Sequence, residues 1–304
     1  MNGSVEISSD KIFFDLLNFG TNSITETEKQ ILENIRLPRT ITAILVGINL
    51  SLSGAILQAV MKNPLADPHI IGISSGAGLF GIFVMMIWND AGALMTPAAF
   101  LGAMLAAILI YFLAWKDGIR PIRVILAGVA VSAFLGAGIS AMLIFYSDRV
   151  HGALLWMVGG LSARSWSHVE ILYPYTIAGM ILTFLSAQQM NVLQLGDEVA
   201  KGLGMRVNLV RTFLTAIAAL LAASAVCVVG LLGFVGLIIP HTARLILGSD
   251  YKFLLPGAAI LGAAVVTISD TFARIIFAPI ELPVGIIMAM IGAPFFLYLL
   301  RKEL

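Results

Sequence analysis

The sequence predicts an all-α membrane protein, a polytopic bundle of about nine transmembrane helices. Of its 304 residues, 59% are hydrophobic and only 12% are charged, and the mean hydropathy is +0.98. Because a water-soluble domain is about 25% charged, this composition excludes a soluble enzyme and a disordered chain. The apolar residues form continuous runs instead of alternating with polar ones, which excludes the strands of a membrane β-barrel.

The balance of charges and the cysteine content exclude further classes of protein. The net charge is +1, from 18 Lys and Arg against 17 Asp and Glu, so the chain has no basic field that would hold a nucleic acid. Cys227 is the single cysteine, which excludes a disulfide framework and a zinc finger.

Nine apolar runs approach the length of about 20 residues that a helix needs to cross the hydrocarbon core. They lie near residues 40–61, 70–88, 91–115, 124–147, 170–187, 208–231, 233–247, 254–278 and 282–300. The first run carries Gly47, Ser51 and Ala55 at four-residue steps, and small residues on one face predict close packing of that helix. The seventh run is the weakest, because Pro240 and His241 interrupt it. Broken helices are tolerated at membrane depth only where protein or a water-filled cavity covers them.

The positive charges of the loops predict the orientation. With the C-terminus in the cytoplasm, eleven Lys and Arg lie inside and seven outside. This bias predicts an extracytoplasmic N-terminal segment (1–39) and a transmembrane domain (40–304) whose longest inner loop is 188–208.

Two ionisable residues lie within the eighth run. Asp270 and Arg274 are four residues apart, so they share a helix face and are expected to pair. Charged residues at membrane depth are costly and usually face protein or water. Two compatible roles remain open: a structural lock between the two residues, or a docking role for Arg274 near the outer end of its helix.

Arg36 and Arg39 flank Leu37-Pro38 just before the first run, on the predicted outer side. They are either anchors at the headgroup boundary or contacts for an acidic partner. Their outer position runs against the positive-inside tendency, which favours the second interpretation.

The inner loop 188–208 contains a predicted short helix. Asp197 and Glu198 lie in its first turn, where acids complement the helix dipole, and Gly202 or Gly204 is expected to end it. A helix of this kind is either a docking site for a cytoplasmic partner or part of an ordinary linker.

No catalytic or metal-binding set is recognisable, and no cofactor is expected. The four histidines (His69, His151, His168 and His241) have no second ligand at metal-binding spacing. No phosphate-binding glycine loop precedes a lysine. The chain is therefore not expected to be an enzyme, and any ATP that powers it would bind another chain.

Several motifs, in order, resemble the permease subunits of ABC importers for iron-siderophores, haem and cobalamin, the FecCD family. The resemblance covers residue 31 to the C-terminus. Its motifs are Arg36-Leu-Pro-Arg39, Gly47, Ser53-Gly54, Gln58, Asn63-Pro64-Leu65-Ala66-Asp67-Pro68, Gly72-Ile-Ser-Ser-Gly76-Ala77, Leu126-Ala-Gly128, Trp156-Met-Val-Gly159-Gly160, Leu195-Gly196 to Leu203-Gly204, Gly233-Phe-Val-Gly-Leu-Ile-Ile-Pro-His241 with Arg244, Leu255-Pro256-Gly257, Asp270 with Arg274, Glu281-Leu-Pro-Val-Gly285 and Gly292-Ala-Pro294.

The resemblance implies a homodimer of permeases in the cell membrane of a prokaryote, with two cytoplasmic ATPase subunits and an extracytoplasmic binding protein. It assigns Arg36, Arg39 and Arg274 to docking of that binding protein, and Pro121 and Ile122 to the position of the inner gate. It assigns coupling to the ATPase to the segment 195–204. The coupling residues are Leu195, Gly196, Asp197, Glu198, Ala200, Lys201, Leu203 and Gly204.

The leading hypothesis is thus an importer permease without chemistry of its own, carrying a ferric siderophore first, with cobalamin or haem next. An ion-coupled secondary transporter is the alternative, and a membrane enzyme is third. A coupled carrier should bury acids along its path, but only Asp270 qualifies, and it has a cationic neighbour.

Family members carry ten spans, the first ahead of the Arg-Leu-Pro-Arg motif, whereas residues 1–35 contain no run long enough to cross. We expect this stretch to resemble the family's first outer loop, with Phe13, Phe14, Leu16 and Leu17 packed on the outer rim. Two explanations remain open: the true start codon lies upstream, or the protein is a natural nine-span variant.

Overall fold

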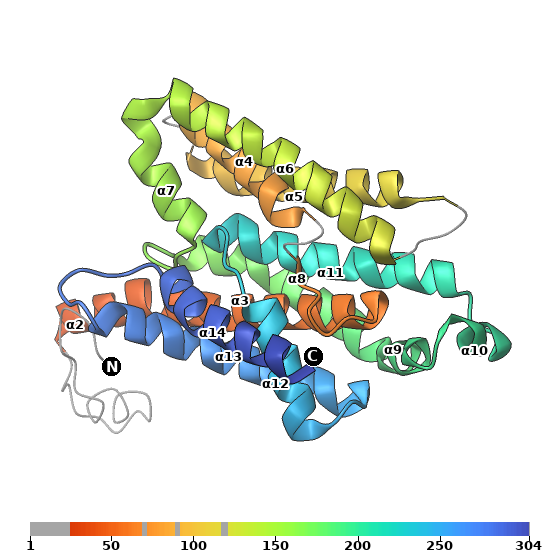
Figure 1. Cartoon of the computed structure of the whole chain (residues 1–304). Coiled ribbons are helices and arrows are strands. Elements are labelled where there is room, and N and C mark those ends of the chain that lie inside the picture. Colours follow the sequence, from red (N-terminus) through yellow and green to blue (C-terminus); the bar gives the residue numbers. More distant parts are fainter. Residues whose placement is uncertain (1–24, 69–71, 89–91, 117–120, 304) are drawn as a thin grey trace.

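The computed structural model describes residues 25–68, 72–88, 92–116 and 121–303, which form a bundle of helices joined by short loops (Figure 1). In order, the helices are α2 (Glu26–Ile31), the π-helical turn η1 (Leu32–Arg36), α3 (Leu37–Met61), α4 (Ile73–Ile87), α5 (Gly92–Ala114), α6 (Pro121–Phe145), the 3-10 turn η3 (Ser147–Arg149), α7 (Val150–Val158), α8 (Trp166–Leu185), α9 (Ala187–Gln194), α10 (Asp197–Gly202), α11 (Val207–Val229), α12 (Val235–Leu247), α13 (Tyr251–Ile275) and α14 (Val284–Glu303). The predicted position of Phe13, Phe14, Leu16 and Leu17 lies outside the described residues.

The predicted membrane helices are confirmed. Within the described ranges, six helices are long and apolar enough to cross a membrane, beginning with the continuous helix Glu26–Met61. Three shorter apolar helices, Ile73–Ile87, Val235–Leu247 and Val284–Tyr298, occupy the second, seventh and ninth predicted runs. The seventh is short and contains Pro240, in keeping with the weakness of that run in the sequence.

The first membrane helix starts earlier than its apolar run, at Glu26 and not near residue 40. The Thr25 side chain accepts a hydrogen bond from the Glu28 backbone, and Glu28 caps Thr25 in return, which satisfies backbone N–H groups that a helix start leaves open. The π-helical turn η1 ends two residues before Pro38, and its wider turn accommodates the missing N–H and the bulky ring of proline. Arg36 and Arg39 therefore lie within a helix and not in a loop ahead of one.

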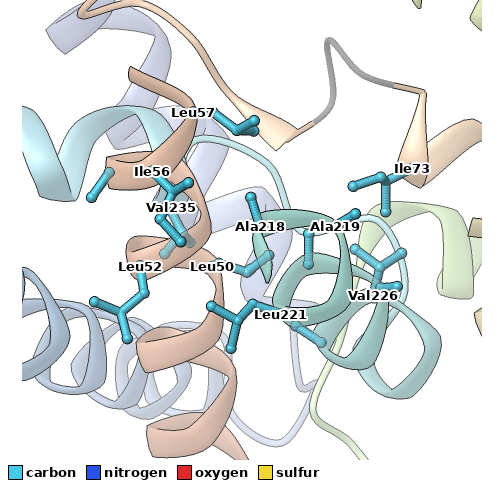
Figure 2. Close-up of a cluster of buried hydrophobic side chains, with 14 of the residues drawn as sticks. Leu50, Leu52, Ile56, Leu57, Ile73, Ala218, Ala219, Leu221, Val226 and Val235 are labelled. Atoms are coloured by element: carbon cyan, nitrogen blue, oxygen red, sulfur yellow. The ribbon is translucent and has the colours of Figure 1, made fainter. Parts of the chain in front are cut away.

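Helix α3 lies in the centre of the bundle, in contact with α8, α11, α12 and α13. Its apolar side chains meet those of α11 and α12 in the core of the molecule (Figure 2). Most residues of α3 are buried, and Figure 1 shows the group α4, α5 and α6 lying beside this central layer. A helix that is packed tightly against its neighbours along most of its length resists bending.

The small residues of α3 allow this close packing. A Cβ added to Gly47 would overlap the carbonyl group of Gly262 on α13, and one added to Gly262 would overlap Gly47. The sequence predicted that small residues would allow close helix packing. In the structure, Gly47 of α3 and Gly262 of α13 do this together, because their backbones are in direct contact.

We expect Gly262→Ala to separate α3 from α13 and to destabilise the bundle by about 3 kcal/mol, the upper end of the cost of overpacking, because the added Cβ clashes with the backbone of Gly47. Gly136→Ala is the matched control, since a Cβ there meets nothing within 4 Å. The thermal midpoint in detergent measures both effects. Equal midpoints for the two variants would contradict the close packing of the two glycines.

Candidate functional site: charged clusters at the two ends of helix α3

The first cluster lies where α3 begins, and we call it the arginine cluster (Arg36, Arg39, Arg164, Asp270, Arg274 and Glu281). Arg39 donates from Nε to Asp270 Oδ2 at 3.0 Å and from Nη2 to Asp270 Oδ1 at 2.9 Å. Its Nη1 donates to Glu281 Oε2 at 2.7 Å. Arg39 is 6% exposed and Asp270 is 2% exposed, so this forked ion pair is buried between α3 and α13.

The predicted pair of Asp270 and Arg274 is present, with Nε 3.3 Å from Oδ2. The principal partner of Asp270, however, is Arg39, which forms two hydrogen bonds with its carboxylate. Arg36 lies close enough to Arg274 for their charges to repel. The structure therefore brings Arg39 and Arg274 together around one buried carboxylate, and it places Arg36 near Arg274.

Sequence reasoning did not assign Glu281 and Arg164 to this cluster. Burial alone would raise the pKa of the Glu281 carboxyl, but the hydrogen bond and positive charge of Arg39 bring this pKa below its ordinary value. Arg164 lies within electrostatic reach of Arg39, and its Nη1 is 3.2 Å from His168 Nε2. Four arginines thus share the cluster with two carboxylates, which leaves it positively charged.

The loop that carries Glu281 is held in place by backbone hydrogen bonds on both sides. Leu282 N donates to Ala273 O at 3.1 Å, and Gly285 N donates to Gly159 O at 3.0 Å. Because Glu281 and Arg39 are 242 residues apart, no local spacing in the sequence could have paired them.

The second cluster lies at the opposite end of the bundle, around α10 (Figure 1). The predicted short helix is present as Asp197–Gly202, between the positive-φ residues Gly196 (φ 108°) and Gly204 (φ 82°). Such φ values favour glycine, which explains why glycines flank this helix.

The 195–204 segment has an exposed face and a buried face. Leu195 is 60%, Val199 50% and Leu203 64% exposed, four residues apart, whereas Ala200 is fully buried. The three exposed side chains form what we call the apolar stripe. Val199 is absent from the predicted coupling residues, although the four-residue spacing of the stripe is a signal that could have identified it.

Asp197 connects α10 to two membrane helices. Lys62 Nζ donates to Asp197 Oδ1 at 2.6 Å, and Arg211 donates to both carboxylate oxygens, at 2.9 and 2.8 Å. Burial alone would raise the pKa of Asp197, but these two cations lower it overall. The ion pairs therefore persist at neutral pH and are lost only as the pH falls through that lowered pKa.

A polar cavity of about 530 Å³ lies beside this second cluster, between α3, α9, α12 and α13. Lys62, His241, Arg244 and Asp250 are among its lining residues. Arg244 Nη1 donates to Gln58 Oε1 at 3.2 Å, so Arg244 of the predicted family motif contacts Gln58 of α3 at this end of the bundle.

The predicted gate residues lie at the start of α6. Pro121 is the first residue of this helix, and Ile122 is 67% exposed. The residues directly before them, 117–120, lie outside the described part of the chain.

In the described ranges, no three His, Cys, Asp or Glu side chains gather closely enough to hold a metal ion. The two clusters consist of ion pairs and exposed apolar side chains, which are suited to holding helices together and to binding partner proteins.

Comparison with known proteins identifies the family to which this sequence is similar. The model of the FecCD transport family matches residues 1–302. The chain is 40% identical over 302 residues to the Fe(3+)-citrate import system permease protein YfmE of Bacillus subtilis, covering 99% of this chain and 89% of the relative. It is 42% identical to the cobalamin import system permease protein BtuC of Halobacterium salinarum, covering 94% of this chain and 77% of the relative. It is 39% identical to the hemin transport system permease protein HmuU of Yersinia pestis, covering 89% and 83%.

The fold agrees with these matches. The chain superposes on an inward-facing structure described as a metal-chelate type ABC transporter, with a TM-score of 0.86 and 28% identity, covering 93% of this chain and 91% of the other. A full-length family match, curated relatives near 40% identity and a shared fold agree with one another, and they show that the chain belongs to the FecCD transport family of ABC importer permeases.

Proposed function

We propose that this chain is the membrane subunit of an ATP-driven importer that passes a ferric siderophore inward, with cobalamin and haem as the next candidates. The observation that carries the proposal is that surfaces of different character lie at the two ends of α3. A positively charged cluster surrounds Arg39, and an exposed apolar stripe lies beside Lys62. An importer of this kind needs one partner on each side of the membrane. A charged surface at one end and an apolar surface at the other would suit two different partner proteins.

The cytoplasmic partner is a pair of ATPase subunits that dock on α10. The apolar stripe of Leu195, Val199 and Leu203 is exposed, and exposed apolar patches mark interaction sites. Glu198 and Lys201 are also exposed, whereas Ala200 is buried. ATP hydrolysis takes place on the partner, and this chain contributes the docking surface.

The extracytoplasmic partner is a binding protein with acidic residues on its docking face. The excess of arginines over carboxylates in the arginine cluster supports this assignment, because complementary potentials guide association. We assign Arg36, Arg39 and Arg274 to this contact as a group, through the positive charge that they share at this end of the bundle.

The functional unit is a homodimer in the cell membrane of a prokaryote, with one path between the two copies. We place the contact between the copies at helix α6, where Leu126, Phe134 and Phe145 are all more than 60% exposed. Pro121 and Ile122 at the start of this helix would then lie at the inner gate. Alternating access follows if ATP-driven movement of α10 tilts the helices to which it is attached.

Reconstitution in proteoliposomes with the ATPase and the binding protein tests the proposal. We expect uptake of a ferric hydroxamate or ferric citrate to require ATP and the binding protein, with cobalamin and haem as parallel arms. An ion-coupled carrier is the alternative function, but Asp270 lies in ion pairs with two arginines and is poorly suited to carry a coupling ion. Uptake driven by a proton or sodium gradient without ATP would favour this alternative and contradict the proposal.

Arg36→Glu is expected to slow association of the binding protein by about tenfold at low salt, because it reverses one of the positive charges of the arginine cluster. The difference from the unmodified protein should shrink at high salt, which screens the long-range attraction between the two proteins. Surface plasmon resonance with the permease in nanodiscs measures both. Lys29→Glu, an equal charge change at an exposed site of α2, is the control. Equal association rates for the two variants would remove Arg36 from the docking surface.

A further inference from the structure

The side chain of Asp197 points away from the surface on which the ATPase would dock. It lies in α10, yet its partners Lys62 and Arg211 belong to the end of α3 and the start of α11. Arg211 is buried, with a side chain only 4% exposed. The three residues form what we call the Asp197 triad (Lys62, Asp197 and Arg211).

Apart from this triad, α10 has few attachments to the membrane helices. It has 6 residues, and Ala200 is its one buried residue, so apolar burial contributes little to its position. A bidentate contact between arginine and a carboxylate fixes both the distance and the orientation of the two groups. The triad therefore supplies a directed connection that packing alone does not supply to so short a helix.

Helix α3 links the triad to the arginine cluster. Arg39 near its start pairs with Asp270 and Glu281, and Lys62 directly follows its last residue. The two positions are about 35 Å apart at 1.5 Å per residue. Because α3 is buried along most of its length and its glycines contact neighbouring backbones, it can shift as a rigid element but cannot easily bend.

We propose that Asp197 is a positioning residue that connects the coupling helix to α3 and α11, and that α3 transmits movement between the ATPase side and the binding-protein side. This inference rests on the proposed function, because it takes α10 to be the helix on which the ATPase docks. It divides the 195–204 segment by role: the apolar stripe contacts the ATPase, whereas Asp197 holds the stripe to the membrane helices.

The test is Asp197→Asn in the complete transporter, reconstituted with its ATPase and binding protein. The change keeps the size of the side chain and removes its charge. We expect the ATPase to remain bound and to hydrolyse ATP, while the number of substrate molecules imported per ATP falls by about tenfold, a size typical of coupling between two sites. Asp250→Asn makes the same change at an exposed residue beside the second cluster but outside the 195–204 segment, and it should leave this ratio unchanged.

A second variant shows whether Asp197 acts through Lys62. Lys62→Met should reduce transport per ATP in the same way, and the double variant should be no worse than Asp197→Asn alone, because residues that act as a unit are not additive. An unchanged ratio in Asp197→Asn, or additive losses in the double variant, would overturn the inference. Loss of ATPase binding in Asp197→Asn would instead make Asp197 a docking residue and would also overturn it.

These outcomes are distinct from failure of the proposed function. If the ATPase still binds and works when the apolar stripe is disrupted, the assignment of α10 as the docking helix fails, whatever Asp197 does. If disruption of the stripe releases the ATPase while Asp197→Asn transports normally, the docking assignment stands and only the positioning role fails.

Discussion

Arg39→Met is expected to destabilise the folded protein by about 3–5 kcal/mol, the usual cost of removing one partner from a buried ion pair. Asp270 is 2% exposed and receives two hydrogen bonds from Arg39. Arg274, with its Nε 3.3 Å away, would be the cation left beside this buried carboxylate. The thermal midpoint in detergent and the yield of monodisperse protein measure the loss.

A second substitution should reverse much of this loss. In Arg39→Met with Asp270→Asn, the buried charge is removed together with its partner, so the double variant should be more stable than Arg39→Met alone. Lys29→Met, at an exposed site in α2, controls for the loss of a positive charge near the same end of the helix. If Arg39→Met has the midpoint of this control, the ion pair with Asp270 does not stabilise the bundle.

Val199→Glu combined with Leu203→Glu is expected to weaken binding of the ATPase by at least about 100-fold, since central residues of an interface often contribute 2 kcal/mol or more each. Both side chains are half exposed or more, so the permease itself should fold normally. Docking of the ATPase would then require the two introduced carboxylates to be desolvated in an apolar interface, which is energetically costly. Copurification of the ATPase and ATP-dependent uptake measure the effect.

The matched control keeps the apolar stripe intact. Val199→Ile with Leu203→Met changes the same two positions without adding charge, and it should retain ATPase binding and uptake. If the glutamate variant copurifies with the ATPase as well as this control does, the stripe is not the docking surface.

The membrane helices could be predicted from the sequence because their signal is local. Each apolar run corresponds to an apolar helix, since a run of this length can satisfy its backbone hydrogen bonds within itself. The short helix at Asp197 was likewise predictable, as its acidic first turn and flanking glycines are neighbours in the chain. The early start at Glu26 was missed because a polar helical extension, capped by Thr25, leaves no trace in hydropathy.

The partners of the charged residues were decided only by the tertiary structure. Asp270 and Arg274 could be paired because they are one helical turn apart, yet the stronger partner, Arg39, is 231 residues from Asp270. Asp197 meets Lys62 across 135 residues in the same way. Hydrophobicity and helical periodicity depend on residues close in sequence, so the sequence alone determined which segments cross the membrane and which faces are small or polar. Which charges meet depends on how the helices pack around α3, and that arrangement exists only in the folded chain.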